Sequence, residues 1–139
     1  MGMFTWNDRY LLGLPLFDSE HKTLFAIADE LNEAVIHGDN TRTQKNLLTR
    51  FINTLVTHFE HEEGLMSHYR YQDMEDHTDE HRALTAQVMK LKQKLDAGAI
   101  TIPLDAMKPV RDWFDRHIRR YDLLVVRHIR GNDMIGLSA

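Results

Sequence analysis

Apolar residues recur at steps of three and four along most of the chain, in four runs separated by short polar breaks. This spacing is close to the helical repeat of 3.6 residues, so each run predicts a helix with one apolar face. The four runs cover residues 18–37, 41–69, 74–95 and 102–131. No stretch shows the alternating pattern of a strand, so we expect an all-α protein.

Single residues indicate where the first and last of these helices begin and end. Asp18 or Ser19 can cap the first helix, and Pro15 before it is expected to keep the N-terminal arm extended. Gly131 is expected near the end of the fourth helix. Pro109 should either kink that helix or mark its true start, because an interior proline removes a hydrogen bond and clashes with the preceding turn.

Four helices of about 20–30 residues with short connections predict an antiparallel up-down-up-down four-helix bundle. Asn40 or Thr41 can cap the second helix, directly after a short connection. We therefore expect a single domain over residues 1–139, with an extended N-terminal arm at 1–17 and the bundle at 18–131.

Composition excludes several classes of partner and site. The chain has 17 basic and 21 acidic residues and a formal net charge of −4, well mixed, so we expect no nucleic-acid partner. No stretch approaches the roughly 18 apolar residues of a membrane span, and the N-terminus lacks a leader pattern, so we expect a cytoplasmic protein without a membrane partner. Cysteine is absent, so any metal must be bound by nitrogen and oxygen.

Polar residues interrupt the apolar faces of the second and third predicted helices. Five of the nine histidines fall within residues 58–81. His58 and Glu62 are four residues apart, and so are His77 and His81, so each pair projects together from its helix. Either pair alone is a weak indication of a metal site, because such spacings are common by chance.

The fourth and first helices add three more polar residues to this pattern. His117 and Asp122 are five apart, an offset of about 140° on an ideal helix, so Asp122 must reach around or the helix must deform locally. His21 lies one turn before the apolar residues of the first helix. In an up-down-up-down bundle all of these residues reach one layer. The seven candidate ligands are His21, His58, Glu62, His77, His81, His117 and Asp122.

Five imidazoles and two carboxylates in one buried layer require a bound partner, since each unsatisfied polar group costs on the order of 1–3 kcal/mol. One tetrahedral zinc would use only four of the seven, and calcium prefers oxygen ligands. Two metals that share both carboxylates and a solvent-derived oxygen bridge account for the set and leave one coordination position open. Nitrogen and carboxylate donors with an open position favour iron and dioxygen chemistry.

This pattern resembles the hemerythrin family, and more closely its single-domain bacterial members. The resemblance covers Trp6 to about His128 and includes the flanking segments "DSEHKTLF", "HFEHEEGLM" and "WFDRHI". It implies a diiron centre with an oxo or hydroxo bridge. The implied ligands are His77, His81 and His117 on one iron, His21 and His58 on the other, and Glu62 and Asp122 as bridges.

The resemblance further implies a non-haem diiron protein that binds dioxygen reversibly, for oxygen storage, delivery or sensing rather than catalysis. Dioxygen would bind at the open position of the iron with two histidines, and an oxygen-using enzyme is a possible partner. The apolar residues beside the ligands are expected to line the dioxygen pocket; they are Leu24, Phe25, Phe59, Trp113 and Phe114. The alternative is a diiron redox enzyme, namely an oxidase, a peroxidase or a nitric oxide handling protein.

Two other helical-bundle classes fit the sequence less well. A histidine phosphotransfer bundle needs one exposed histidine, and a ferritin-like diiron protein needs ExxH repeats that are missing here. The remaining histidines are expected at the surface or in turns; they are His37, His61, His68 and His128. Glu63 and the arginines of residues 116–130 are interpreted as solvated helix-face charges.

Three positions depart from the pattern usual in the family. Gln72 stands where a proline is usual, which should loosen the connection between the second and third helices, and Pro109 is unexpected at its position. The apolar stretch "LLVV" after Asp122 indicates either core packing or a self-association surface, and the sequence leaves the oligomeric state open.

Overall fold

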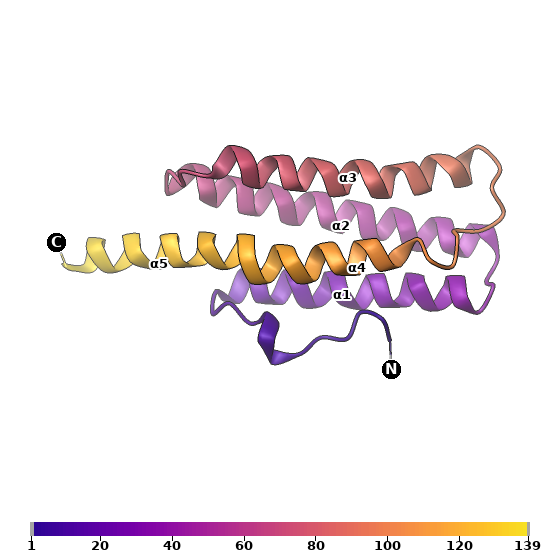
Figure 1. Cartoon of the computed structure of the whole chain (residues 1–139), viewed down its shortest axis with the longest axis horizontal. Helices are drawn as coiled ribbons and strands as arrows, with labels where there is room; N and C mark the ends of the chain where they lie inside the picture. Colours follow the sequence, from indigo (N-terminus) through magenta and orange to yellow (C-terminus); the bar gives the residue numbers. More distant parts are fainter. Residues whose placement is uncertain (1, 139) are drawn as a thin grey trace.

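The computed structural model describes the backbone of residues 2–138 and the side chains of residues 2–132. It contains four antiparallel helical rods joined by short connections, in the predicted up-down-up-down order, which confirms the all-α bundle (Figure 1). The first three rods are α1 (Pro15–Ile36), α2 (Thr41–His68) and α3 (Met74–Asp96). The fourth is continuous and consists of α4 (Met107–Arg116), the π-helical segment η2 (His117–Asp122) and α5 (Leu123–Ser138).

The first helix begins three residues earlier than the sequence predicts. Pro15 is its first residue, where a proline costs nothing because that backbone N–H would have no partner. Asp18, predicted as a possible cap, instead accepts hydrogen bonds from the N–H groups of Leu12 and Gly13, at 2.8 and 3.1 Å. The acidic side chain therefore holds the preceding turn against α1. Because Pro15 is helical, its interpretation as part of an extended arm was wrong.

The N-terminal arm is packed against the bundle and is only partly extended. It includes a short 3₁₀ helix, η1 (Asp8–Tyr10), and it buries the side chains of Phe4 and Tyr10. Both rings pack against Phe25 of α1, with centroids 6.1 and 4.9 Å apart. The Tyr10 hydroxyl donates a hydrogen bond to Asp115 of α4 at 2.8 Å, which ties the arm to the fourth rod.

The second helix has the predicted start, because the side chain of Asn40 accepts a hydrogen bond from the N–H of Thr43 at 2.8 Å. The fourth rod confirms one of the two alternatives predicted for Pro109, and it continues past its predicted end. Pro109 lies in the first turn of α4, where no intrahelical hydrogen bond is lost, so it marks the helix start rather than a kink. Gly131 does not end the rod, because α5 continues to Ser138.

The core runs the length of the bundle, and the stretch after Asp122 contributes to it in part. Val125 and Val126 are each only 1% exposed, which confirms core packing for half of that stretch. Leu124 is 46% exposed and lies outside the core. Within the described residues, none of the helices is both long enough and apolar enough to cross a membrane.

Candidate metal centre

All seven polar residues singled out in the sequence meet in one buried layer of the bundle. The layer lies where the beginnings of α1 and α3, the end of α2 and the segment η2 come level with one another. Each of the seven side chains is at most 2% exposed. Charged and polar groups are rarely buried this completely unless they are paired or bind a metal.

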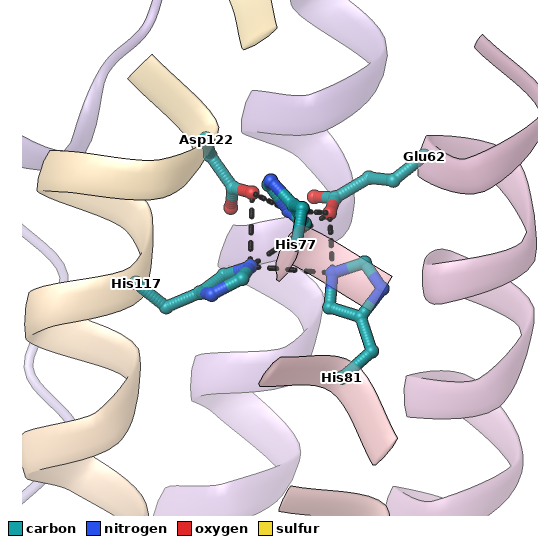
Figure 2. A group of neighbouring side chains, drawn as sticks. All are labelled: Glu62, His77, His81, His117 and Asp122. Carbon is teal, nitrogen blue, oxygen red and sulfur yellow. Dashed lines mark hydrogen bonds and ion pairs between the residues drawn. The ribbon is translucent and has the colours of Figure 1, made fainter. Parts of the chain in front are cut away.

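The donor atoms fall into two groups, and each group has its ligand atoms within 4.8 Å of one another. The first group consists of Glu62, His77, His81, His117 and Asp122, which Figure 2 shows converging from three rods. The second consists of His21, His58, Glu62 and Asp122. Glu62 and Asp122 belong to both groups, so each carboxylate lies between two sets of imidazoles.

All five histidines present Nε2 to the interior of the layer. The Nε2 atoms of His21 and His58 are 3.0 Å apart, and those of His81 and His117 are 3.2 Å apart. Within each pair, one Nε2 can donate a proton to the other, which must then accept it with its lone pair. The Nε2 atoms of each pair therefore point toward the same small region. Both oxygens of Asp122 approach imidazole nitrogens to 3.1 Å or less without hydrogen-bonding geometry. This donor set fits cation binding.

The π-helical segment explains how Asp122 reaches the site. A π-helix pairs residue i with residue i+5, so the wider turn brings Asp122 over His117 instead of 140° away, as an α-helix would. The carboxylate then lies 3.0 Å from His117 Nε2. The structure thus confirms the predicted local deformation of the helix at this point.

Two further carboxylates support the site, and sequence reasoning missed both. Glu20 accepts a hydrogen bond from His58 Nδ1 at 2.8 Å, and Glu63 accepts one from His81 Nδ1 at 2.8 Å. The prediction that Glu63 is a solvated charge was therefore wrong. A ligand histidine needs an acceptor for its second nitrogen, but which neighbouring helix supplies it depends on the packing between helices.

The other histidines lie outside the two donor groups. His37 and His68 are exposed, and the half-exposed His61 donates from Nδ1 to the second oxygen of Glu20 at 2.6 Å. His128 is partly buried and contacts the backbone carbonyl of Tyr69 through Nε2 at 2.6 Å. Glu20 thus connects a buried histidine with one at the surface.

The acidic and basic groups of the layer shift each other's pKa values strongly. Burial and the charge of Glu62 raise the pKa of Asp122, but contacts with His117 and His21 outweigh them and leave it below its ordinary value. Burial also raises the pKa of Glu62, and His58 and other imidazoles bring it well below the ordinary value. Both carboxylates are therefore ionised and able to bind cations at neutral pH.

The pKa values of His58 and His77 are shifted in the opposite direction. Burial lowers the pKa of His58, but Glu62 and Glu20 raise it to about 10. Burial likewise lowers the pKa of His77, whereas Asp122 and Glu62 raise it to about 9. Protons on these rings balance the two carboxylates in the metal-free protein, and a bound cation would take the place of those protons.

Two of the five predicted apolar wall residues stack directly on candidate ligands. The Phe59 ring lies 3.8 Å from the His81 ring at an interplanar angle of 6°, and Trp113 lies 4.1 Å from His117 at 13°. Phe25 and Phe114 are buried and contact each other, with centroids 5.9 Å apart. Leu24 is fully buried in α1. Apolar rings thus cover two of the candidate ligands, and the other three predicted wall residues are buried.

Comparison with known sequences places this site in a family. Residues 12–129 match the family described as the hemerythrin HHE cation binding domain. A bacteriohemerythrin of Methylococcus capsulatus is 30% identical over 125 residues, which cover 89% of this chain and 95% of the relative. Myohemerythrin-1 of Phascolopsis gouldii is 26% identical over 119 residues, which cover 86% and 88% of the two chains.

Solved structures agree with the sequence comparison. The crystal structure of a wild-type hemerythrin is 28% identical and superposes with a TM-score of 0.83, covering 90% of this chain and 96% of the other. A hemerythrin variant gives a TM-score of 0.86 at 28% identity, covering 93% and 98%. With the matched segment spanning all seven buried donors, this chain belongs to the hemerythrin family.

Proposed function

We propose that this protein holds two iron ions in the buried layer and binds dioxygen reversibly. The observation that carries the proposal is the pair of donor groups sharing Glu62 and Asp122. Two groups of donors with two common carboxylates suit two neighbouring cations better than one. Imidazole and carboxylate donors without thiolates favour iron among the common metals that react with dioxygen. Names of relatives such as bacteriohemerythrin and myohemerythrin support the same function.

In this proposal His77, His81 and His117 would hold one iron, and His21 and His58 would hold the other. Glu62 and Asp122 would be shared by the two ions, because each belongs to both groups. The two groups differ by one histidine, so the open position would belong to the ion held by His21 and His58. Two ferrous ions would supply the electrons that dioxygen takes up on binding and gives back on release.

The neighbouring carboxylates orient the ligands. With Nδ1–H donating to Glu20 or Glu63, the rings of His58 and His81 are fixed as the tautomer whose Nε2 lone pair faces the layer. The negative charge of each acceptor also makes its imidazole a stronger donor toward a cation. The metal ions would therefore meet ligands that are already oriented.

The apolar residues around the layer exclude water. Phe59 and Trp113 cover two ligand rings with their flat faces, and we assign both to the wall of the dioxygen pocket. Leu24, Phe25 and Phe114 are assigned to the same wall because they are buried and lie within about one helical turn of His21 or His117 in the sequence. Water or protons at a bound dioxygen would favour loss of the reduced gas and leave both irons ferric. A dry wall therefore favours reversible binding over oxidation.

The test is an absorption spectrum of iron-loaded protein, reduced without air, exposed to dioxygen and then degassed. We expect charge-transfer bands that appear with dioxygen and vanish on degassing. Reversible binding of this kind is what a cytoplasmic store that delivers dioxygen to an oxygen-using enzyme requires. Immediate and irreversible oxidation would overturn reversible binding in favour of a diiron redox enzyme. Binding of fewer than two iron ions per chain would overturn the ligand assignment.

A further inference from the structure

The fourth rod carries a strongly basic surface on a chain that is acidic overall. Residues 116–130 contain five arginines, all exposed, and their one acidic residue is the fully buried Asp122. The formal net charge of the whole chain is −4. Figure 1 shows that this part of the rod is continuous with α4 and that α5 extends past the ends of the other helices. A partner approaching this segment would therefore meet a local excess of basic over acidic side chains.

Three of the five arginines are used within the fold. Arg116 pairs with Glu80 at 3.5 Å, Arg119 pairs with Asp115 at 3.6 Å, and Arg130 donates to the carbonyl of Gly13 at 2.9 Å. For the other two, Arg120 and Arg127, no acidic partner occurs among the side chains of residues 2–132. Their charge is therefore free to attract a partner molecule.

An exposed apolar residue lies between the two unpaired arginines. Leu124 is 46% exposed, four residues after Arg120 and three before Arg127, so the three side chains follow one line along the rod. Tyr121 is half-buried beside them, and the Arg120 guanidinium lies 6.0 Å from its ring centroid. We call Arg120, Tyr121, Leu124 and Arg127 the Arg120 face. An apolar centre with charged neighbours is the usual composition of a protein-binding surface.

Tyr121 connects this face with the candidate metal ligands. Its ring stacks on His117 at a centroid distance of 5.5 Å and an angle of 15°, and it meets His77 edge to face at 6.0 Å. Both histidines belong to the donor group with three imidazoles. A molecule bound to the Arg120 face would thus be separated from two ligand rings by a single aromatic side chain.

We propose that the Arg120 face is the docking surface of an acidic one-electron donor protein that restores the ferrous state of the site. The proposal rests on the proposed function, because a dioxygen carrier that has lost its electrons needs two from outside. Two donor molecules dock in turn, each is oxidised by one electron, and the two ferric ions become ferrous. Arg120 and Arg127 attract the donor, Leu124 supplies the apolar contact, and Tyr121 provides the short path to His117 and His77.

Charge favours this occupant over a second copy of the chain. A two-fold dimer centred on the Arg120 face would place Arg120 and Arg127 against the same arginines of the partner, and such like-charge contacts are unfavourable. An acidic donor instead has the opposite sign. Electrostatic attraction of this kind mainly accelerates association, and salt weakens it.

The experiment measures reduction of the iron-loaded ferric protein by a reduced plant-type [2Fe–2S] ferredoxin, an acidic one-electron carrier, in a stopped-flow instrument. We expect R120E/R127E to lower the second-order rate constant at least tenfold at low ionic strength and to weaken its salt dependence. The matched control is R42E/K90E, which changes the net charge equally at two exposed positions on α2 and α3. The control should keep at least half of the wild-type rate, and dithionite should reduce all three proteins alike.

A second pair of variants tests the path through Tyr121. Y121F keeps the aromatic ring and should keep the wild-type rate, whereas Y121L should slow electron transfer about tenfold without changing ferredoxin affinity in surface plasmon resonance. The proposal is overturned if R120E/R127E matches the control. Dimerisation of the wild type, but not of R120E/R127E, in sedimentation would also overturn it, because the face would then bind a second copy.

Failure of the proposed function gives a different result. A protein that takes up no iron, or that does not bind dioxygen reversibly, refutes that function by its spectrum. Ferredoxin binding measured by surface plasmon resonance still tests the docking surface in that case. Loss of binding in R120E/R127E but not in R42E/K90E supports the Arg120 face, and equal binding by both variants refutes it.

Discussion

Glu63 accepts a hydrogen bond from His81 Nδ1 at 2.8 Å, although the residue before it, Glu62, points into the buried layer. Two adjacent acidic residues of α2 therefore act on the same histidine from different sides. Glu62 approaches Nε2 of His81 at 2.9 Å, and Glu63 holds Nδ1. The ring is held at both nitrogens, which sets its orientation.

Replacing Glu63 with alanine should weaken metal binding by about 10–100-fold, because His81 would lose the acceptor that orients it. Glu63→Gln keeps an oxygen acceptor without the charge and should lose less. Affinity can be measured by competition with a chelator of known strength. Glu60→Ala is the matched control, since Glu60 is exposed on the same helix. A Glu63→Ala protein that binds as tightly as this control would contradict the orienting role.

Glu20 should affect the other donor group. Glu20→Ala removes the acceptor of His58, so one of the two metal ions should bind about 10–100-fold more weakly while the other is retained. Metal titrations followed by elemental analysis would show this as a drop from two tight ions to one. His61→Ala is the control, because His61 contacts only the outer oxygen of Glu20. Equal weakening of both ions would argue against separate support of the two groups.

The π-helical segment contains one residue more than an α-helical turn needs, and this leads to an unusual expectation for deletions. Removing the exposed Arg119 should convert η2 to an α-helix, leave Asp122 four residues after His117, and preserve both metal uptake and the packing of α5. Removing the exposed Glu60 from α2 should abolish metal uptake, because the following ligand rotates by about 100°. Metal content and circular dichroism would check both. Loss of metal from the Arg119 deletion would contradict this interpretation of η2.

The stability of the metal-free protein should depend on pH in a way that metal removes. The pKa values of His58 and His77 are raised to about 10 and 9 from an ordinary 6.5, so their protonation stabilises the fold fully below pH 6.5 and progressively less up to those values. Glu62 and Asp122 have lowered pKa values, so their contribution is lost as the pH falls below their ordinary range.

Urea unfolding with a chelator should therefore show stability declining between pH 6.5 and 10. If His58 and His77 bind the metal, they would be neutral at pH 6.5 and at pH 10 alike. The alkaline decline in stability should then be much smaller with metal bound. A metal-free protein equally stable at pH 6.5 and 9.5 would show that the buried rings carry no proton in the native state.

Much of the candidate site follows from spacing along single helices. Residues four apart lie on the same face of any α-helix, as do His58 with Glu62 and His77 with His81. Their convergence could therefore be predicted once the order of the helices in the bundle was predicted correctly. The five-residue spacing of His117 and Asp122 even indicated a deformation, which the structure shows as η2. The buried faces of the helices were predictable for the same reason, since the period of 3.6 is local.

The sequence by itself thus determined four helices, their inward faces and seven buried donors, because each of these depends on residues within a few turns of one another. Only the tertiary structure decided which acidic residue meets which histidine, as for Glu20 with His58 and Glu63 with His81, because helix rotation and height set those pairs. It also decided that Asp18 holds the arm, that Tyr121 is half-buried against His117, and that Leu124 is exposed between two arginines. Contacts between helices depend on the relative placement of whole segments, which no local spacing encodes.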